Sequence, residues 1–366
     1  MSEPRPPEPV PQSYPPQPYP PPYPPYPPPQ PSRLGWLWVL LAVFVPVVFF
    51  GCLCLMFASA VASLGQVEAA PIQEKRYKPY RYKGTQKIVI IHVQGTILDG
   101  TSVVRQAERV IRDKSVRAVV LRINSPGGTI AGSDAILQAL KEMRHSRENE
   151  PLPLVVSMGA LAASGGYYVA MAVEDTPQSI YAEPTTWTGS IGVIIPRYNM
   201  AQLAQKIGVQ EDSIVSHPLK KMGDFFSDLT PEERNILQGL VDDAFAQFKR
   251  VVLSGRPQLK PQELDKLATG QIYTSAQAIQ LKLVDRQGYL DDAIARAAEL
   301  AGLSTEQIYV VEYRGAFGLL ELLGTQVLHR QEPLQQLLQA ATPRAWYLCT
   351  WLPGVSTGRI TGLRNP

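Results

Sequence analysis

The chain has 366 residues, of which 45% are hydrophobic and 18% charged, and its formal net charge is +3. This charge balance gives no indication of a nucleic-acid partner, which a strongly basic domain would suggest. The bulk composition is that of a globular protein, and the length can hold about two average domains.

The N-terminal 33 residues differ from the rest in composition. Of the 34 prolines in the chain, 17 precede Arg33, in a stretch of Pro, Tyr and Gln with almost no aliphatic side chain. Such a segment has little apolar surface to bury and stays extended, with polyproline II character. We interpret residues 1–33 as a disordered tether, and the alternative is a ligand for a proline-binding partner.

Residues 34–64 contain no charged side chain and are rich in Leu, Val, Phe and Trp. About 20 apolar residues cross the hydrocarbon core of a bilayer, so this stretch predicts a transmembrane helix. The small residues Ala58-Ser59-Ala60 resemble a signal-peptide cleavage site, which is the alternative. The apolar run is longer than that of a signal peptide and begins after more than thirty residues, which favours a retained anchor.

A basic linker, residues 65–86, follows the predicted span. Only Arg5 and Arg33 precede the span, whereas five basic residues follow it closely: Lys75, Arg76, Lys78, Arg81 and Lys83. The positive-inside rule alone would place the following domain in the cytoplasm. Cys52 and Cys54 lie in the span and Cys349 near the C-terminus, so we expect no disulfide in the globular part and no metal or cofactor.

Apolar runs at 87–93, 117–123 and 154–158 predict strands, and they alternate with helical spacing at 103–114, 130–144 and up to Met171. This alternation predicts an α/β fold, a parallel sheet with helices on both faces. Sites in such folds lie at the carboxyl ends of the strands. Gly127-Gly128 and Ser164 both follow predicted strands.

The second half predicts short strands and several helices. Strands are expected at 178–182 and 188–194 and at the sheet edge over 212–216, with a helix over 200–207. A long helix is expected over 231–253, where Thr230 is the N-cap and Pro231 the first helical residue. Three further predicted helices complete the domain, at 261–268, 275–281 and 290–301.

Ser164 is the candidate nucleophile. It lies between Ala162-Ala163 and Gly165-Gly166, and small neighbours let a substrate carbonyl reach the hydroxyl. The amides of a strand-to-helix junction can also stabilise a developing oxyanion. The alternative is that Ser164 is only an N-cap and that the glycines permit close packing.

A nucleophilic serine needs a general base. The four histidines, His92, His145, His217 and His329, do not lie at a glycine-lined strand end, which argues against a Ser/His/Asp triad. A lysine can act as the base when its pKa is lowered, and adjacent amines lower each other's pKa. Lys220 and Lys221 lie in a partly apolar loop that suits this role. The alternative is a pair of solvated lysines.

Three blocks in order, Arg122–Gly128, Met158–Tyr168 and Thr188–Ile194, resemble the signature blocks of the signal peptide peptidase A family of membrane serine proteases, in its short single-domain form. Residues 229–234, 270–274 and 283–285 resemble the helical second half of its domain. The resemblance covers residues 87–302. It implies a crotonase- or Clp-protease-like fold, preceded here by one transmembrane helix.

The resemblance also implies roles for single residues. Ser164 matches the nucleophile and Lys220 the general base, while the N–H groups of Gly127 and Gly165 match the oxyanion hole. Ser190 is a possible supporting residue. Lys221 stands where the family usually has an acidic residue, so the sequence leaves open which of the two lysines is the base.

The family resemblance implies a membrane-anchored serine endopeptidase that degrades remnant signal peptides or other hydrophobic peptides. It further implies a homo-oligomeric ring, in which one subunit supplies the serine and its neighbour the lysine. The catalytic domain would lie on the non-cytoplasmic side of the cell membrane, which opposes the charge count above. A catalytically inactive scaffold of the same fold is the alternative, and the Lys-Lys departure supports it. An acyl-thioester enzyme of the related fold is a third interpretation, although it has no use for a serine at this position.

A C-terminal extension, residues 303–366, follows the resembling region. Residues 317–328 predict an amphipathic helix, and the stretch from Trp346 to Trp351 is apolar. We expect the extension to pack against the domain; contact with a neighbouring subunit or with the membrane is the alternative.

Overall fold

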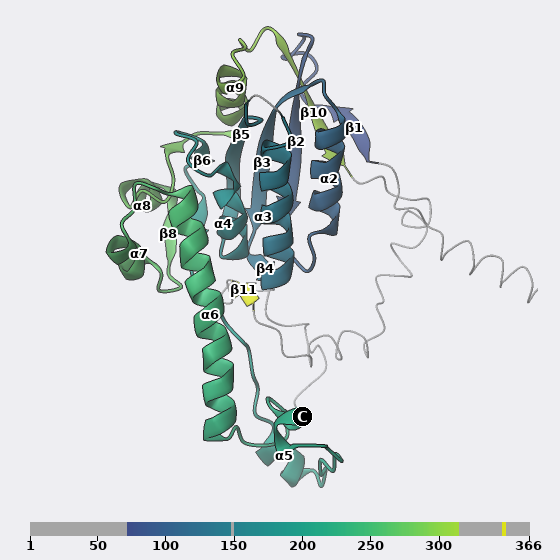
Figure 1. Cartoon of the computed structure of the whole chain (residues 1–366), viewed down its shortest axis with the longest axis vertical. Helices are drawn as coiled ribbons and strands as arrows, with labels where there is room; N and C mark the ends of the chain where they lie inside the picture. Colours follow the sequence, from purple (N-terminus) through teal and green to yellow (C-terminus); the bar gives the residue numbers. More distant parts are fainter. Residues whose placement is uncertain (1–71, 148–149, 315–345, 349–366) are drawn as a thin grey trace, which may run out of the picture. The chain divides into compact units, whose positions relative to one another are not determined.

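The computed structural model describes residues 72–147, 150–314 and 346–348 (Figure 1). The chain divides into two compact units, Met1–Glu68 and Ala69–Pro366, and the described residues all belong to the second. The proline-rich tail and the predicted transmembrane span at 34–64 therefore lie outside the described residues. Within the described ranges, no helix is both long and apolar enough to cross a bilayer.

The centre of the fold is a mixed, mostly parallel sheet with the strand order β1-β10-β2-β3-β5-β6-β9. The five strands from β10 to β6 and the short β9 pair in parallel, whereas β1 pairs antiparallel with β10. Two further short strands extend the sheet, since β7 pairs in parallel with the end of β5 and antiparallel with β8. The strands are β1 (Gln73–Arg76), β2 (Gln86–Gln94), β3 (Val116–Ser125), β5 (Leu154–Ala163), β6 (Ile180–Ala182), β7 (Trp187–Gly189), β8 (Ile272–Thr274), β9 (Arg286–Gln287) and β10 (Ile308–Arg314).

Helices cover both faces of this sheet, as the alternating pattern predicted. Successive side chains of a strand point to opposite faces. Val89 and Ile91 of β2 therefore join the core under α2 (Thr101–Arg112), α3 (Ile130–Arg144) and α4 (Gly165–Ala170). Ile88 and Ile90 join a second core under α9 (Leu290–Leu300). Figure 1 shows α2, α3 and α4 side by side along one face.

The second half of the domain includes the short helices η1 (Met171–Val173), α5 (Ala201–Lys206), η2 (Pro218–Lys221), α7 (Pro261–Leu267) and α8 (Ser275–Gln280). Its longest helix, α6 (Pro231–Gly255), begins as predicted, because Thr230 and Glu233 form a reciprocal capping box. Phe248 and Val252 near its C-terminal end are fully buried in the core. The N-terminal half of α6 is largely exposed, and Figure 1 shows α5 beyond that end.

The expected edge strand at 212–216 is wrong. These residues make no strand pairing, and Ile214 and Val215 are exposed. A short apolar run is stable as a strand only when a neighbouring strand accepts its backbone hydrogen bonds, and none of the described strands lies beside it.

Two segments after the resembling region also take part in the fold. β10 inserts between β1 and β2 of the main sheet. β11 (Trp346–Leu348) forms a separate two-stranded antiparallel sheet with β4 (Gly127–Thr129), and the Tyr347 side chain is fully buried. Packing against the domain is thus confirmed for this residue, while the predicted helix at 317–328 lies outside the described residues.

Candidate active site

Ser164 lies at the turn from β5 into α4, with a backbone conformation that L-residues rarely adopt (φ 54°, ψ −117°). Such a conformation costs roughly 1–3 kcal/mol and persists only where surrounding structure enforces it. Here the Ser164 N–H donates to the Gly189 carbonyl oxygen (2.8 Å), and its own carbonyl accepts from the Tyr168 N–H (2.8 Å). A serine on a strained strand-to-helix turn is typical of an enzyme nucleophile.

The Ser164 hydroxyl is fully buried, and its Oγ has no hydrogen-bond partner in the described part of the chain. Ser164 is the N-cap residue of α4 by position, but its side chain makes no capping hydrogen bond. A buried hydroxyl without a partner costs free energy that a structural serine would avoid. The hydroxyl is therefore not held in a hydrogen bond by any of the described residues.

Gly127 and Gly165 bring two backbone segments into contact beside Ser164. Gly127 has a positive φ of 94°, and a Cβ on it would overlap the backbone of Gly165. A Cβ on Gly165 would lie 3.1 Å from the Gly127 Cα and from the Gly128 nitrogen, and would collide with the Ser133 hydroxyl. Only glycines allow this approach. Close packing by the glycines after Ser164 was the alternative interpretation of the sequence.

The Gly127 N–H already has an acceptor in this structure. It donates to the Ser125 Oγ (3.1 Å), which in turn donates to the Gly95 carbonyl (2.6 Å). A substrate oxyanion would have to replace the Ser125 hydroxyl as the acceptor of this N–H group. Ser125 is therefore a component of the site. It lies inside the motif Arg122–Gly128, but its residue type alone did not mark it as a site residue.

Ser190 lies next to Ser164 in space. Ala163 and Gly189 are partners in the β5–β7 register, so the residues that follow them, Ser164 and Ser190, leave the sheet at the same edge. Ser190 is 6% exposed and its N–H donates to the Gln271 carbonyl (2.7 Å). It opens into a pocket of about 460 Å³. That pocket is lined by residues 190–194, by 268–270 and by one side of α6 (Gln238, Val241, Asp242 and Phe245).

The two candidate lysines lie on η2, away from the sheet. Lys220 is exposed and forms no ion pair with any residue in the described ranges. The Lys221 ammonium pairs with the Glu211 carboxylate, and this hydrogen bond raises the pKa of Lys221 above its ordinary value. Since Ser164 Oγ has no partner, neither amine reaches the serine within the described chain.

Two of the described histidines are held by other residues. His217 Nδ1 accepts from the Leu219 N–H (3.2 Å), and His145 pairs with Glu174 (2.7 Å). Neither of these two histidines forms a hydrogen bond with Ser164 in the described part of the chain. The described residues also hold no group of three or more His, Cys, Asp or Glu side chains that could bind a metal ion.

Comparison with known proteins places the chain in a family. Residues 146–304 match the model of peptidase family S49. A protein of Synechocystis sp. named "Putative protease slr0021" is 39% identical over 231 residues, which are 63% of this chain and 80% of that protein. The chain belongs to peptidase family S49, the signal peptide peptidase A family.

Two other S49 relatives are longer than the matched region. "Putative signal peptide peptidase SppA" of Enterococcus faecium is 35% identical over 222 residues, which are 57% of this chain and 62% of that protein. "Serine protease SPPA, chloroplastic" of Arabidopsis thaliana is 30% identical over 254 residues, which are 68% of this chain and 36% of that protein. The chain thus spans only about a third of the length of the plant relative.

The S49 match includes Ser164, Gly165, Ser190, Lys220 and Lys221, whereas Gly127 precedes it. Residues after 304, including β11, lie outside the match.

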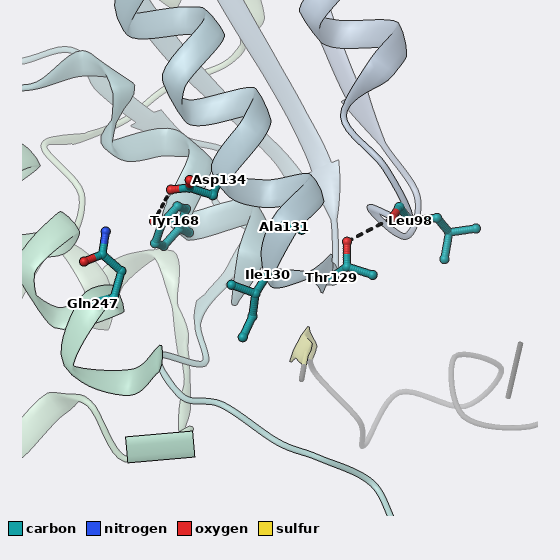
Figure 2. A pocket seen from close by; sticks show the side chains of 7 residues that line it. All are labelled: Leu98, Thr129, Ile130, Ala131, Asp134, Tyr168 and Gln247. Carbon is teal, nitrogen blue, oxygen red and sulfur yellow. Dashed lines mark hydrogen bonds between the residues drawn. The ribbon is translucent and has the colours of Figure 1, made fainter. Parts of the chain in front are cut away.

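A second pocket, of about 680 Å³, lies beside β4 and is lined by residues of α3, α4 and α6 (Figure 2). The Tyr168 hydroxyl donates to the Asp134 carboxylate (2.7 Å), and the Thr129 hydroxyl donates to the Leu98 carbonyl (2.9 Å). The pocket is lined by Leu98, Thr129, Ile130, Ala131, Asp134, Tyr168 and Gln247. In this S49 chain, β4 thus runs from Gly127, which contacts Gly165 beside Ser164, to Thr129, which lines this pocket.

Sequence reasoning missed three features of this site: Glu211 as the partner of Lys221, Ser125 as the acceptor of the Gly127 N–H, and Tyr347 at β4. Ser125 lies inside a recognised motif, so its position was a usable signal. Glu211 is ten residues from Lys221 and Tyr347 more than two hundred from β4, and no local pattern predicts such contacts.

Proposed function

We propose that this S49 peptidase is a serine endopeptidase in which Ser164 is the nucleophile. The observation that carries the proposal is the setting of Ser164. Its backbone has a positive φ, its buried hydroxyl has no hydrogen-bond partner among the described residues, and it lies beside the contact between Gly127 and Gly165. The Arabidopsis relative is named a serine protease, which supports the same reaction type.

In the proposed mechanism, a neutral lysine amine takes the Ser164 proton and Oγ attacks a peptide carbonyl. The N–H groups of Gly165 and Gly127 stabilise the oxyanion, the latter after exchanging Ser125 for the substrate oxygen. As the peptide bond breaks, the lysine ammonium gives its proton to the leaving amine. The neutral lysine then takes a proton from water, whose oxygen attacks the acyl group and releases it from Ser164, which regains a proton from the lysine.

We infer that Lys220, rather than Lys221, is the base. A general base must lose its proton near neutral pH. The ion pair with Glu211 raises the pKa of Lys221 and keeps that amine protonated, whereas Lys220 forms no ion pair among the described residues.

We propose that Lys220 acts on the serine of a neighbouring subunit in a homo-oligomeric ring. The exposed position of η2 and a set of exposed apolar side chains around α5 and the start of α6 support this arrangement, because such patches commonly mark protein contacts. This apolar surface consists of Tyr198, Met200, Leu203, Ile207, Val209, Ile214, Val215, Phe226, Ile236 and Leu240.

The proposed substrates are hydrophobic peptides at the membrane, among them remnant signal peptides, as the printed name of the Enterococcus relative suggests. The transmembrane anchor, the non-cytoplasmic location and the kinship with crotonase and Clp-protease folds belong to the same proposal.

Two cations of the basic linker stabilise the fold. Lys78 and Arg81 both form ion pairs with Asp291 at the start of α9 (both 2.6 Å).

The test is hydrolysis of casein and of a signal-like peptide by the full chain in detergent. Ser164→Ala and Lys220→Ala should each lower the rate by at least about 10²–10⁴-fold, while Lys221→Ala should keep most of it. Mixing the Ser164→Ala and Lys220→Ala chains should restore activity if the dyad forms between subunits. An oligomeric wild type that neither hydrolyses these substrates nor reacts with a serine-directed acylating probe would instead support the inactive scaffold.

A further inference from the structure

Two lysines are adjacent on the 3-10 helix η2, and their surroundings differ. Lys220 is exposed and forms no ion pair with any described residue. The Lys221 side chain is 30% exposed and pairs with the carboxylate of Glu211, which is 20% exposed. With three residues per turn, neighbouring side chains of a 3-10 helix point about 120° apart. The two amines therefore leave the same turn in different directions.

Glu211 lies in the segment that follows α5, and its carboxylate is held from two sides. The Ser213 N–H donates to Oε1 (3.0 Å), while Oε2 accepts a hydrogen bond from the Lys221 ammonium. The bond with Ser213 fixes the carboxylate to its own turn. Glu211 is thus a fixed acceptor to which the longer lysine side chain extends.

The helix η2 has little other anchorage. None of its residues is buried, and the Lys220 N–H donates to the His217 carbonyl (2.9 Å) within the same turn. Among the described residues, the bond between Lys221 and Glu211 is the one side-chain hydrogen bond that joins η2 to another segment. The direction of the Lys221 side chain therefore depends on Glu211.

Glu211 also determines the charge of Lys221. The hydrogen bond from Lys221 to Glu211 is the main reason that the pKa of this lysine is raised, and the nearby charges of Asp224 and Asp212 act in the same direction. A protonated amine cannot accept the proton of a serine hydroxyl. Without its partner, Lys221 has a flexible four-carbon stem and can reach much of the space that Lys220 reaches.

We propose that Glu211 selects the general base: it holds Lys221 in an ion pair and so leaves Lys220 as the amine of η2 that acts on Ser164. Glu211 is then a positioning residue, because it acts through Lys221 and touches neither the substrate nor the serine. This inference rests on the proposed function, in which a lysine of η2 takes the Ser164 proton.

The first test is a rescue in the full chain in detergent, with casein as the substrate. Lys220→Ala removes the proposed base. Adding Glu211→Gln should raise the hydrolysis rate at least tenfold above that of Lys220→Ala alone, because the released Lys221 then serves as the base. Damage to the fold does not produce such a gain in activity.

Asp212→Asn is the matched control. Asp212 follows Glu211 in sequence, is exposed and forms no ion pair with a described residue, yet its substitution removes the same charge. Added to Lys220→Ala, it should leave the rate unchanged. An equal gain from both acidic substitutions, or no gain from Glu211→Gln, would overturn the proposal.

A third substitution identifies the amine that is released. Lys221→Ala, added to the chain with Lys220→Ala and Glu211→Gln, should abolish the gain. Activity that persists in this triple variant would come from another group and would contradict the selection of lysines by Glu211.

A second measurement does not depend on activity. In the Lys220→Arg chain, η2 keeps a single amine, and acetic anhydride acetylates only an unprotonated amine. Peptide mass spectrometry at pH 8 should show Lys221 acetylated at least threefold faster after Glu211→Gln and less than twofold faster after Asp212→Asn. Equal rates in the Glu211→Gln and parent chains would show that Glu211 does not hold Lys221, and would overturn the proposal.

These readouts separate this proposal from the proposed function. If Lys220→Ala alone keeps the wild-type rate, Lys220 is not the base, and the selection by Glu211 fails with it. If Lys220→Ala is inactive and Glu211→Gln restores nothing, the assignment of Lys220 stands and only the selection by Glu211 fails.

Discussion

The N–H of Ser164 donates a 2.8 Å hydrogen bond to the carbonyl of Gly189, and this bond ties the strained serine to the end of β7. Gly189 itself has a positive φ of 86°. The position of the candidate nucleophile therefore depends on the conformation of a residue 25 positions away, at the edge that also carries Ser190.

Substitution of Gly189 should thus disturb the serine. In Gly189→Ala, the new Cβ would lie 2.6 Å from the Tyr273 ring, in addition to the strain of the positive φ. We expect a loss of about 1–3 kcal/mol in the free energy of unfolding and a lower hydrolysis rate. Gly270→Ala is the matched control, since Gly270 has a similar φ of 79° but open space around it. Denaturant unfolding measures the free energy of unfolding of both variants. An equal loss in both would show that the contact with Tyr273 does not contribute to the effect.

Arginine substitutions should distinguish the two lysines. Arginine keeps the positive charge but does not lose its proton near neutral pH, so it cannot act as a general base. Lys220→Arg should lower kcat/KM by about 10²–10⁴-fold at every pH from 7 to 10. Lys221→Arg can keep the pair with Glu211 and should retain most of the activity. The opposite order of the two rates would identify Lys221 as the base.

The ion-pair cluster at Lys87 should make stability depend on acid pH. Lys87, with a side chain only 6% exposed, binds Glu74 (2.7 Å) and Asp113 (2.8 Å). Burial alone would raise the pKa of Asp113, but the hydrogen bonds from Lys87 and Ser115 outweigh it and lower the pKa to about 2. The carboxylate therefore stabilises the fold above its ordinary pKa of 3.8, and this contribution is lost as the pH falls through about 2.

In Lys87→Met, this acid dependence should become smaller, because Asp113 loses its cation. The contribution at neutral pH amounts to about 2 kcal/mol. Thermal melting at pH 7 and at pH 2.5 should show a wild-type advantage that shrinks at the lower pH. Lys114→Met, at an exposed lysine next to Asp113 in sequence, should behave as the wild type. A wild-type advantage that does not change with pH would contradict the role of this cluster.

Sequence by itself was sufficient for most of the elements and for the candidate nucleophile. The apolar run at 87–93 became β2, and the Thr230-Pro231 signal marked the start of α6, because strand periodicity and helix capping depend on neighbouring residues. The family resemblance named Gly127 and Gly165 together, and the structure brings their backbones into contact. The expected strand at 212–216 failed because a strand also needs a partner, which local sequence does not specify.

Only the tertiary structure decided which distant residues meet. It paired Lys221 with Glu211, kept both lysines of η2 away from Ser164 within one chain, and brought Tyr347 against Tyr168 and Phe248. These contacts join segments that are separate in sequence, and they form because packing and burial across the whole domain outweigh the entropy lost on closing long loops. Local patterns carry no information about that balance, so they predicted elements and candidate residues but not which distant residues meet.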